Sequence, residues 1–172
     1  MDPQIIIDWF KLQPNTQEGG YFAGTYTSTI GISSKDLPGF KPIKETRPIC
    51  SAIYYSLDNN GFSAMHKATG DMLYHFYSGD PVQMLLLYPE NSLNKSEVCI
   101  FTNDIASGGC PMKLIPGGTW LGSHLTPGGS YALMGVTMSP GFNPDDYEIA
   151  KRDDLIKQYP EQEALILDLT RD

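Results

Sequence analysis

Positive charge and long apolar runs are both scarce in this sequence. Lys and Arg number 12 against 20 Asp and Glu, which gives a formal net charge of −8. Binding to nucleic acid or to an anionic membrane needs a basic surface, so we expect neither partner. No apolar run approaches the roughly 20 residues that a membrane-spanning helix requires. The first residues also lack the basic region that opens a secretory signal, and we expect a cytoplasmic protein.

Cysteines and familiar catalytic motifs are scarce as well. Cys50, Cys99 and Cys110 are odd in number and show no CxxC spacing, which argues against a disulfide framework and against a zinc knuckle. We expect inert thiols. The patterns GxSxG, GxxxxGK[ST], GxGxxG and HExxH do not occur. Serine hydrolases of the nucleophile-elbow type, nucleotide-binding proteins and zincins therefore lack the residues that they require.

Glycine, proline and aromatic residues are abundant by contrast. The 172 residues include 17 Gly and 13 Pro, and 11% are aromatic. Many short apolar segments separated by Gly- and Pro-containing turns are typical of an all-β sandwich or jelly roll. We expect a single domain over residues 1–172, with strands at 21–30, 50–57, 63–67, 72–77, 82–88, 97–102, 112–115, 119–125 and 131–138.

Helices are expected at both ends of the chain. Asp2 followed by Pro3 is typical of a helix start, and Asp145 with Asp146 can cap a second helix. Residues 31–48 form a long connection that is either a functional lid or a disordered insertion. The expected parts are an N-terminal helix, a β-barrel and a helical tail, at about 3–13, 20–140 and 145–170.

Residues 61–81 concentrate the candidate chemistry. They contain two of the three histidines and the densest aromatic cluster. Because side chains alternate along a strand, Met72, Tyr74 and Phe76 share one face and His75 takes the other. His124 lies beside a hairpin, where we expect it to be exposed.

The sequence resembles the cupin superfamily in the layout of Gly61, His66 and Gly79, followed by Pro116-x-Gly118. It is similar in particular to the Cupin_5 (DUF985) group of small single-domain cupins. The resemblance implies a double-stranded β-helix, the cupin jelly roll, with short N-terminal and C-terminal helices. It also implies a homodimer and a small-molecule pocket between two sheets. The motifs that carry it are EGGYF (18–22), SAIYY (51–55), HFYSGDP (75–81), IPGGTW (115–120) and SPGFNPDDYE (139–148).

Metal-binding cupins take two histidines and a glutamate from their first motif and another histidine from their second. Carried over to this chain, only the first position is a ligand, His66. The other three positions hold Ala68, Met72 and Leu121. A single imidazole among apolar side chains is a poor metal site. We therefore predict no bound metal and no other cofactor.

Each candidate site residue has a functional and a structural reading. The resemblance points His66 into the barrel, either as a general base or as a histidine held by a structural hydrogen bond. Glu18, before two glycines, either enters the mouth of the pocket or lies in an exposed turn. Four aromatic residues either stack on a sugar or aromatic ligand or belong to the core or an interface: Tyr54, Tyr74, Phe76 and Trp120.

Two functional hypotheses remain open. The first is a metal-free cupin that binds a small molecule without turnover, through Tyr54, His66, Met72, Tyr74, Phe76, Trp120 and Leu121. The second is a sugar isomerase or epimerase, similar to the metal-free nucleotide-sugar epimerases that share the barrel. There His66 would be the base, Tyr54 or Tyr74 the acid, and Glu18 or Asp71 would orient the imidazole. A cavity with a hydrogen-bonded His66 would favour the enzyme, and a filled barrel would favour a structural or interaction protein.

Overall fold

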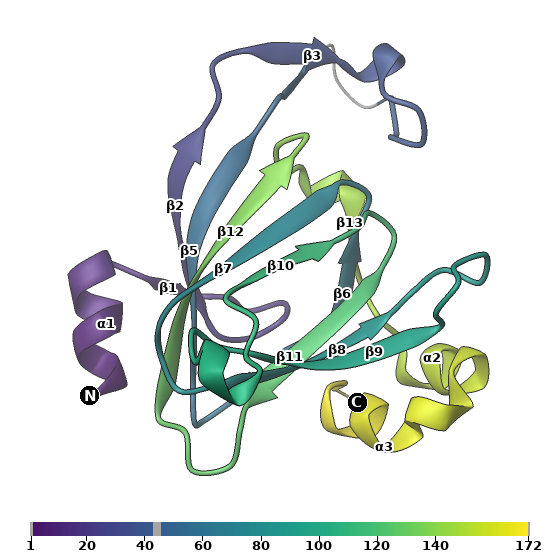
Figure 1. The fold of residues 1–172 in the computed structure, drawn as a ribbon. Coiled ribbons are helices and arrows are strands. Elements are labelled where there is room, and N and C mark those ends of the chain that lie inside the picture. Colours follow the sequence, from purple (N-terminus) through teal and green to yellow (C-terminus); the bar gives the residue numbers. More distant parts are fainter. Residues whose placement is uncertain (1, 43–45, 172) are drawn as a thin grey trace.

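Two antiparallel sheets face each other and form the body of the protein (Figure 1). The computed structural model describes residues 2–42 and 46–171. Over these residues the six-stranded sheet contains, in spatial order, β1 (Gln13–Pro14), β2 (Tyr21–Thr27), β5 (Ser51–Asp58), β12 (Tyr131–Ser139), β7 (Asp71–Gly79) and β10 (Met112–Ile115). The five-stranded sheet contains β13 (Tyr147–Ile149), β6 (Ser63–Ala68), β11 (Trp120–Leu125), β8 (Val82–Leu87) and β9 (Ser96–Phe101).

The chain changes sheet at almost every turn from β5 to β12. β5, β7, β10 and β12 belong to the six-stranded sheet, and β6, β8, β9 and β11 belong to the other. This winding is the jelly roll that the sequence predicts, and the fold prediction is confirmed. β8 lies between β11 and β9. Its inner face packs in the barrel interior and its outer face packs against the C-terminal helices, which explains its nearly continuous apolar sequence.

The space between the sheets is filled over much of its volume. Alternate residues of facing strands meet there, as the period of two along a β-strand requires. Phe101 packs edge-on against Tyr74 and Phe76, with ring centroids 6.3 and 5.6 Å away. Further fully buried members of this interior cluster are Leu57, Val82, Met84, Leu86, Ile115, Leu121, Ala132 and Met134.

The N-terminal helix α1 (Pro3–Phe10) is shorter than expected. The Asp2 side chain accepts a hydrogen bond from the Gln4 amide, as its capping role predicts. Lys11 adopts a left-handed conformation at φ 53° and ends the helix. α1 packs through Ile6 on the outer face of the six-stranded sheet. None of the helices in the described ranges is long and apolar enough to cross a membrane.

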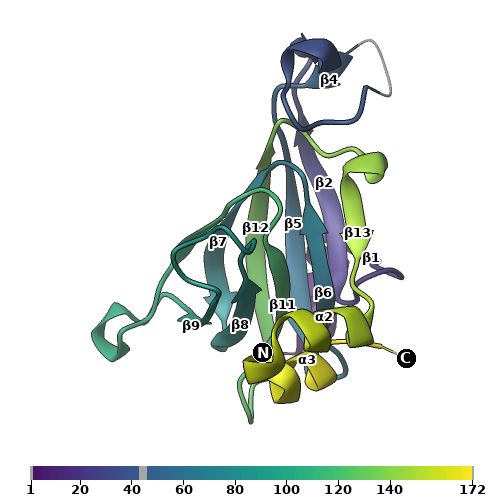
Figure 2. The same ribbon diagram turned by 90° about the vertical axis from the view of Figure 1, so that its right-hand side faces the viewer.

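The C-terminal tail differs from the expectation. Asp145 and Asp146 do not begin an α-helix. They lie in a single 3-10 turn, Pro144–Asp146, after which β13 pairs with the edge of β6. The pairing with β6 prevails over local capping because it satisfies the backbone groups of this segment. The α-helices begin later, at α2 (Arg152–Gln158) and α3 (Glu163–Asp168), and they pack against the outer face of the five-stranded sheet (Figure 2).

Residues 31–42 and 46–48 form an arm above the barrel rather than a plain connection (Figure 1). Within the arm, β3 (Gly31–Ser33) pairs with β4 (Thr46–Pro48), whereas 43–45 lie outside the described residues. Arg47 is fully buried at the base of the arm. Its guanidinium donates to the Asp146 carboxylate at 3.0 Å and to the Lys41 carbonyl at 2.6 Å. This ion pair fastens the arm to the segment before β13.

Replacing Arg47 with Met should destabilise the protein strongly, because it leaves the Asp146 carboxylate buried without its cation. We expect a loss of about 3 kcal/mol in the free energy of unfolding, measured by urea denaturation. The double variant Arg47→Met/Asp146→Leu should recover more than half of that loss. As a control, Glu148→Gln breaks the exposed pair with Lys67 and should cost less than about 0.5 kcal/mol. Equal losses of unfolding free energy in Arg47→Met and Glu148→Gln would contradict the prediction.

Candidate functional site

A cavity of about 570 Å³ occupies the part of the barrel that the core does not fill. Most of its wall comes from the inner faces of β2, β5, β7 and β12, with His66 on β6 opposite. The segments 13–18 and 142–147 complete it. Phe22, Tyr26 and Phe142 line the cavity and remain 37%, 56% and 46% exposed. The cavity therefore opens to solvent between these aromatic side chains.

A tight loop between β1 and β2 carries Glu18 to the cavity wall. The Asn15 backbone bonds to Gly19 and Gly20, and its side-chain oxygen accepts from the amides of Gln17 and Glu18. The Asn15 side chain therefore takes the place of a backbone carbonyl, as in an Asx turn. Glu18 is 7% exposed as a result, and the alternative of an exposed turn residue is excluded.

The two glycines after Glu18 allow this close approach. Gly19 and Gly20 have φ of 103° and 69°, a region that favours glycine. A Cβ on Gly19 would lie 2.2 Å from the Phe62 carbonyl oxygen, and one on Gly20 would lie 2.6 Å from that of Ser56. Both positions exclude any side chain, so the Glu-Gly-Gly sequence is a requirement of the site geometry.

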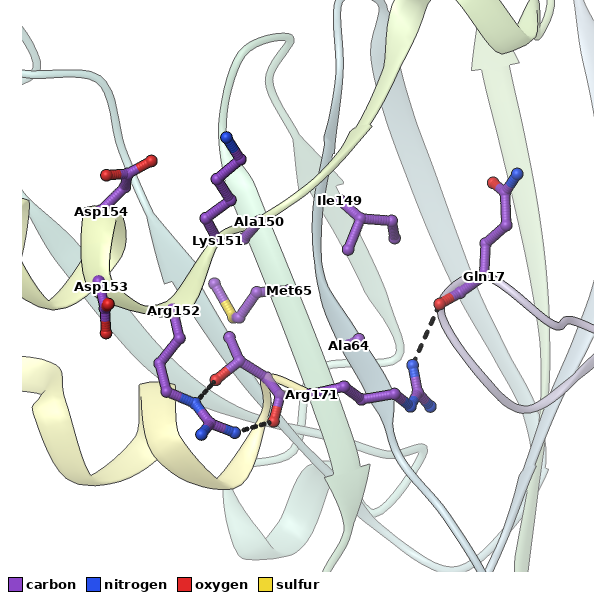
Figure 3. A pocket seen from close by; sticks show the side chains of 11 residues that line it. Gln17, Ala64, Met65, Ile149, Ala150, Lys151, Arg152, Asp153, Asp154 and Arg171 are labelled. Carbon is purple, nitrogen blue, oxygen red and sulfur yellow. Dashed lines mark hydrogen bonds between the residues drawn. The ribbon is translucent and has the colours of Figure 1, made fainter.

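The backbone of Glu18 is also held from the C-terminal end of the chain. The Glu18 carbonyl accepts from the Ala64 amide at 2.7 Å and from the Arg171 guanidinium at 2.8 Å. Arg171 donates in addition to the carbonyls of Gln17 and Phe62 and covers the Phe62 ring. Figure 3 shows Arg171 reaching from the C-terminal segment toward Gln17. The tail thus fixes the loop that carries the buried carboxylate.

Glu18, His66 and Tyr147 form a polar group within the cavity wall. The Tyr147 hydroxyl donates a short hydrogen bond to Glu18 Oε2. The same oxygen lies 3.5 Å from His66 Nε2. The rings of His66 and Tyr147 stack, with centroids 5.4 Å apart and planes 27° apart. β13 brings Tyr147 to this place because it pairs with β6, which carries His66.

Hydrogen-bond geometry assigns a proton to Nδ1 of His66. Nδ1 lies 2.8 Å from the Ala64 carbonyl oxygen, and a carbonyl only accepts, so Nδ1 carries a proton. Both imidazole nitrogens therefore face protein oxygens, Nδ1 the Ala64 carbonyl and Nε2 the Glu18 carboxylate at 3.5 Å.

Burial raises the pKa of every tyrosine around this group. Desolvation is the main cause for Tyr55, Tyr74 and Tyr147, and the charge of Glu18 raises each pKa further. The three phenols remain protonated at neutral pH and act as hydrogen-bond donors there. Tyr55 donates to the Gly19 carbonyl at 2.8 Å.

The residues chosen from the sequence divide between cavity and core. Glu18, His66, Met72 and Tyr74 line the cavity together. Phe76 and Leu121 belong to the filled interior instead, and Leu121 pairs in register with His66.

Two of the expected ligand-binding residues need correction, because they face away from the cavity. Tyr54 packs on Phe10 of α1 at the outer face of the sheet, with centroids 4.6 Å apart. Trp120 lies on the outside of the other sheet, with Lys67 Nζ 4.2 Å from its ring centroid. In both cases the alternation along the strand directs the ring outward, and the neighbouring residue Tyr55 or Leu121 points inward.

Other predicted positions are resolved by their contacts. His75 lies between the inward-facing Tyr74 and Phe76 and therefore faces outward, as the alternation predicts. His124 is half-buried rather than exposed, and its Nδ1 lies 2.7 Å from the Leu125 carbonyl oxygen. Asp71 accepts from the Gly117 amide at 2.8 Å. Of the two carboxylates considered for orienting His66, Glu18 is the one in place.

Sequence reasoning missed Tyr147 and Tyr55 as cavity residues. For Tyr147 nothing local indicates that its strand pairs with β6. Tyr55 had a usable signal, since it is two residues from Ile53 on an alternating strand and both line the cavity.

Comparison with known proteins identifies the family of this chain. A model of the Cupin_5 family, described as cupin superfamily (DUF985), matches residues 4–150. The chain belongs to the Cupin_5 family. No curated protein sequence matches it significantly.

Solved structures agree with this assignment of the Cupin_5 chain. A crystal structure from Shewanella oneidensis is 27% identical, with a TM-score of 0.82 over 99% of this chain and 98% of that one. A hypothetical protein from Leishmania major is 21% identical, with a TM-score of 0.87 over 100% of both chains. A cupin 2 conserved barrel domain protein from Rhodopseudomonas palustris is 12% identical, with a TM-score of 0.59 over 94% of this chain and 90% of that one.

The metal common in cupins does not fit the donors of this Cupin_5 chain. No group of three or more His, Cys, Asp or Glu able to hold an ion occurs within residues 2–42 and 46–171. At the inner wall His66 is accompanied by Met72 and Leu121, and its own Nδ1 is bonded to Ala64. Glu18 is the single carboxylate nearby, and it already accepts from Tyr147. These contacts supply too few ligands to displace the water of a transition metal.

The buried tyrosines predict a loss of stability at alkaline pH. Above about pH 10 the unfolded chain releases tyrosine protons that the folded chain retains, so the free energy of unfolding falls by about 1.4 kcal/mol per pH unit for each such tyrosine. Tyr147→Phe removes one of them and should reduce this slope accordingly. Urea denaturation at several alkaline pH values measures it. Identical slopes in the two proteins would contradict the raised pKa of Tyr147.

Proposed function

We propose that this Cupin_5 protein binds a small molecule in the barrel cavity without turning it over. The observation that carries the proposal is a cavity of about 570 Å³ with largely apolar and aromatic walls and one buried polar group, Glu18–His66–Tyr147. Ligand sites in proteins have this size and this division between apolar walls and a few orienting polar groups.

The contrast between the filled and open parts of the barrel supports a ligand. Protein interiors pack as densely as organic crystals, and large voids are rare. In this barrel Phe76, Phe101 and Leu121 fill the space beyond the cavity. Gly24 stands on the cavity wall where a larger side chain would fill it, since a Cβ there would meet no heavy atom within 4 Å. The open space favours a binding role over a purely structural one.

The isomerase alternative has less support from the same geometry. An isomerase would need a cavity and a hydrogen-bonded His66, and both features are present. The Nδ1 nitrogen, however, is held by Ala64, and Nε2 is directed at Glu18. A general base needs a lone pair that reaches the substrate. Tyr54 faces outward and cannot act as the general acid in the cavity. Of the two tyrosines considered for that role, Tyr54 and Tyr74, only Tyr74 lines the cavity.

A homodimer and a cytoplasmic location complete the proposal. The exposed side chains of Ile5 and Trp9 on α1, 56% and 79% accessible, support contact with a second copy. Sedimentation equilibrium of the purified protein tests the dimer, and cell fractionation tests the location.

A tryptophan at position 24 should block ligand binding while preserving the fold. Gly24 has no positive φ and an unobstructed Cβ direction, so Gly24→Trp extends into the cavity. The probes are phenol, indole, glucose, galactose and glycerol, titrated against the labelled protein by NMR. We expect one or more to shift the amides of Tyr74 and Tyr147, and Gly24→Trp to weaken that binding by at least about tenfold.

Gly61→Trp is the matched control for this substitution. Gly61 also has an open Cβ direction but lies on the turn between β5 and β6, away from the cavity. This variant should bind as the wild type does. Equal weakening in both variants, or no probe that shifts the cavity residues, would overturn the proposal. Conversion of a bound sugar to its epimer, lost in His66→Ala, would establish the isomerase instead.

A further inference from the structure

The cavity lining contains no lysine or arginine among the residues that the structure describes. Its one carboxylate, Glu18, and its one imidazole, His66, face each other at 3.5 Å. The remaining polar groups are the phenols, hydroxyls and amides of uncharged side chains. Because of this composition, the negative charge of an anionic ligand would not be balanced by a lysine or arginine of the lining.

The guanidinium of Arg171 is already committed to backbone carbonyls. Arg171 lies behind the Glu18 loop, where it donates to the carbonyls of Gln17, Glu18 and Phe62. An anionic ligand would therefore lose its hydration on entering the cavity. It would gain no bond from a lysine or arginine of the lining, and it would lie beside the Glu18 carboxylate. Desolvating a phosphate or carboxylate under these conditions is strongly unfavourable. The net charge of −8 also opposes the approach of an anion.

The polar groups at the inner wall suit hydroxyl groups. Tyr74 is 3% exposed and lines the cavity, and its hydroxyl has no hydrogen-bond partner within the described ranges. Tyr74 lies close enough to Glu18 for the carboxylate charge to act on it. A phenol that lines a cavity without a hydrogen bond to the protein can donate to a ligand there, and a sugar hydroxyl is an acceptor of that kind.

The mouth of the cavity supplies apolar faces beside amide groups. Phe22, Tyr26 and Phe142 line the cavity there with exposed rings, and Gln13 and Gln17 belong to the same lining. The carbon-bound hydrogens of a sugar ring form an apolar face that packs on an aromatic ring, while its hydroxyl edge bonds to amides.

We infer that the ligand of this cavity is a neutral sugar, and that the site rejects the phosphorylated and carboxylated forms of the same sugar. The inference rests on the proposed function, because it specifies the ligand class of that cavity. It also separates this chain from the nucleotide-sugar epimerases that share the barrel, whose substrates carry a diphosphate.

The test compares matched neutral and anionic sugars. The neutral set is glucose, galactose, mannose, fructose, ribose and arabinose, and the anionic set holds the monophosphate of each sugar together with glucuronate and galacturonate. Each compound is titrated by NMR against the amides of Gly24, Tyr74 and Tyr147. We expect at least one neutral sugar to bind, and its monophosphate to bind at least about tenfold more weakly, a difference of about 1.4 kcal/mol.

The carboxylate responsible for this preference can be neutralised without changing its shape. Glu18→Gln removes the negative charge and can keep an amide oxygen at the position of Oε2, which accepts from Tyr147 and faces His66 Nε2. It should reduce the discrimination between sugar and sugar phosphate to less than about threefold. Glu148→Gln removes the same charge at the exposed pair with Lys67, outside the cavity. It should leave the discrimination unchanged.

The outcomes distinguish the inference from the function on which it rests. A sugar phosphate that binds as tightly as its neutral parent would overturn the inference and leave a binding function in place. Binding of phenol or indole that Gly24→Trp abolishes, with no sugar bound, would overturn the sugar assignment alone. If no probe of any class shifts the cavity residues, both fail together. Unchanged discrimination in Glu18→Gln would refute the role given to the carboxylate.

Discussion

The need to satisfy one buried carboxylate shapes the cavity end of this protein. Glu18 is taken out of water, and the structure compensates by supplying the Tyr147 hydroxyl and the His66 imidazole to the same oxygen. Meeting that need requires β13 to pair with β6, two glycines to let the loop approach, and Arg171 to hold its backbone. Elements from both ends of the chain therefore converge on a single side chain, as buried charges demand.

The division of the barrel into a packed and an open part follows from side-chain size. Phe76 and Phe101 meet edge to edge and fill the interior beyond the cavity. On β2, which forms part of the cavity wall, Gly24 leaves open space between the inward-facing Phe22 and Tyr26. The same jelly roll thus provides a stable core and a pocket, and stability at the core allows the pocket to remain unfilled.

The inner wall of this cupin barrel is poor in metal ligands within the described residues. Met72 and Leu121 occupy positions where metal-binding cupins place ligands, and His66 alone remains. Its imidazole now serves a hydrogen-bonded group with Glu18, a carboxylate that enters from the loop before β2 rather than from the cupin motif itself. Under the proposed binding function, a ligand would meet hydrogen-bond donors and acceptors at this part of the wall.

The sequence by itself determined the strands, the turns between them and the inward direction of Met72, Tyr74 and Phe76, because alternation and turn chemistry are local properties. It also indicated Glu18 and His66. Only the tertiary structure decided that Tyr147 completes their group, that Tyr55 rather than Tyr54 faces inward, and that residues 147–149 form a strand. Those outcomes depend on which strands pair across the barrel. Pairing joins residues about eighty positions apart, and no local pattern records it.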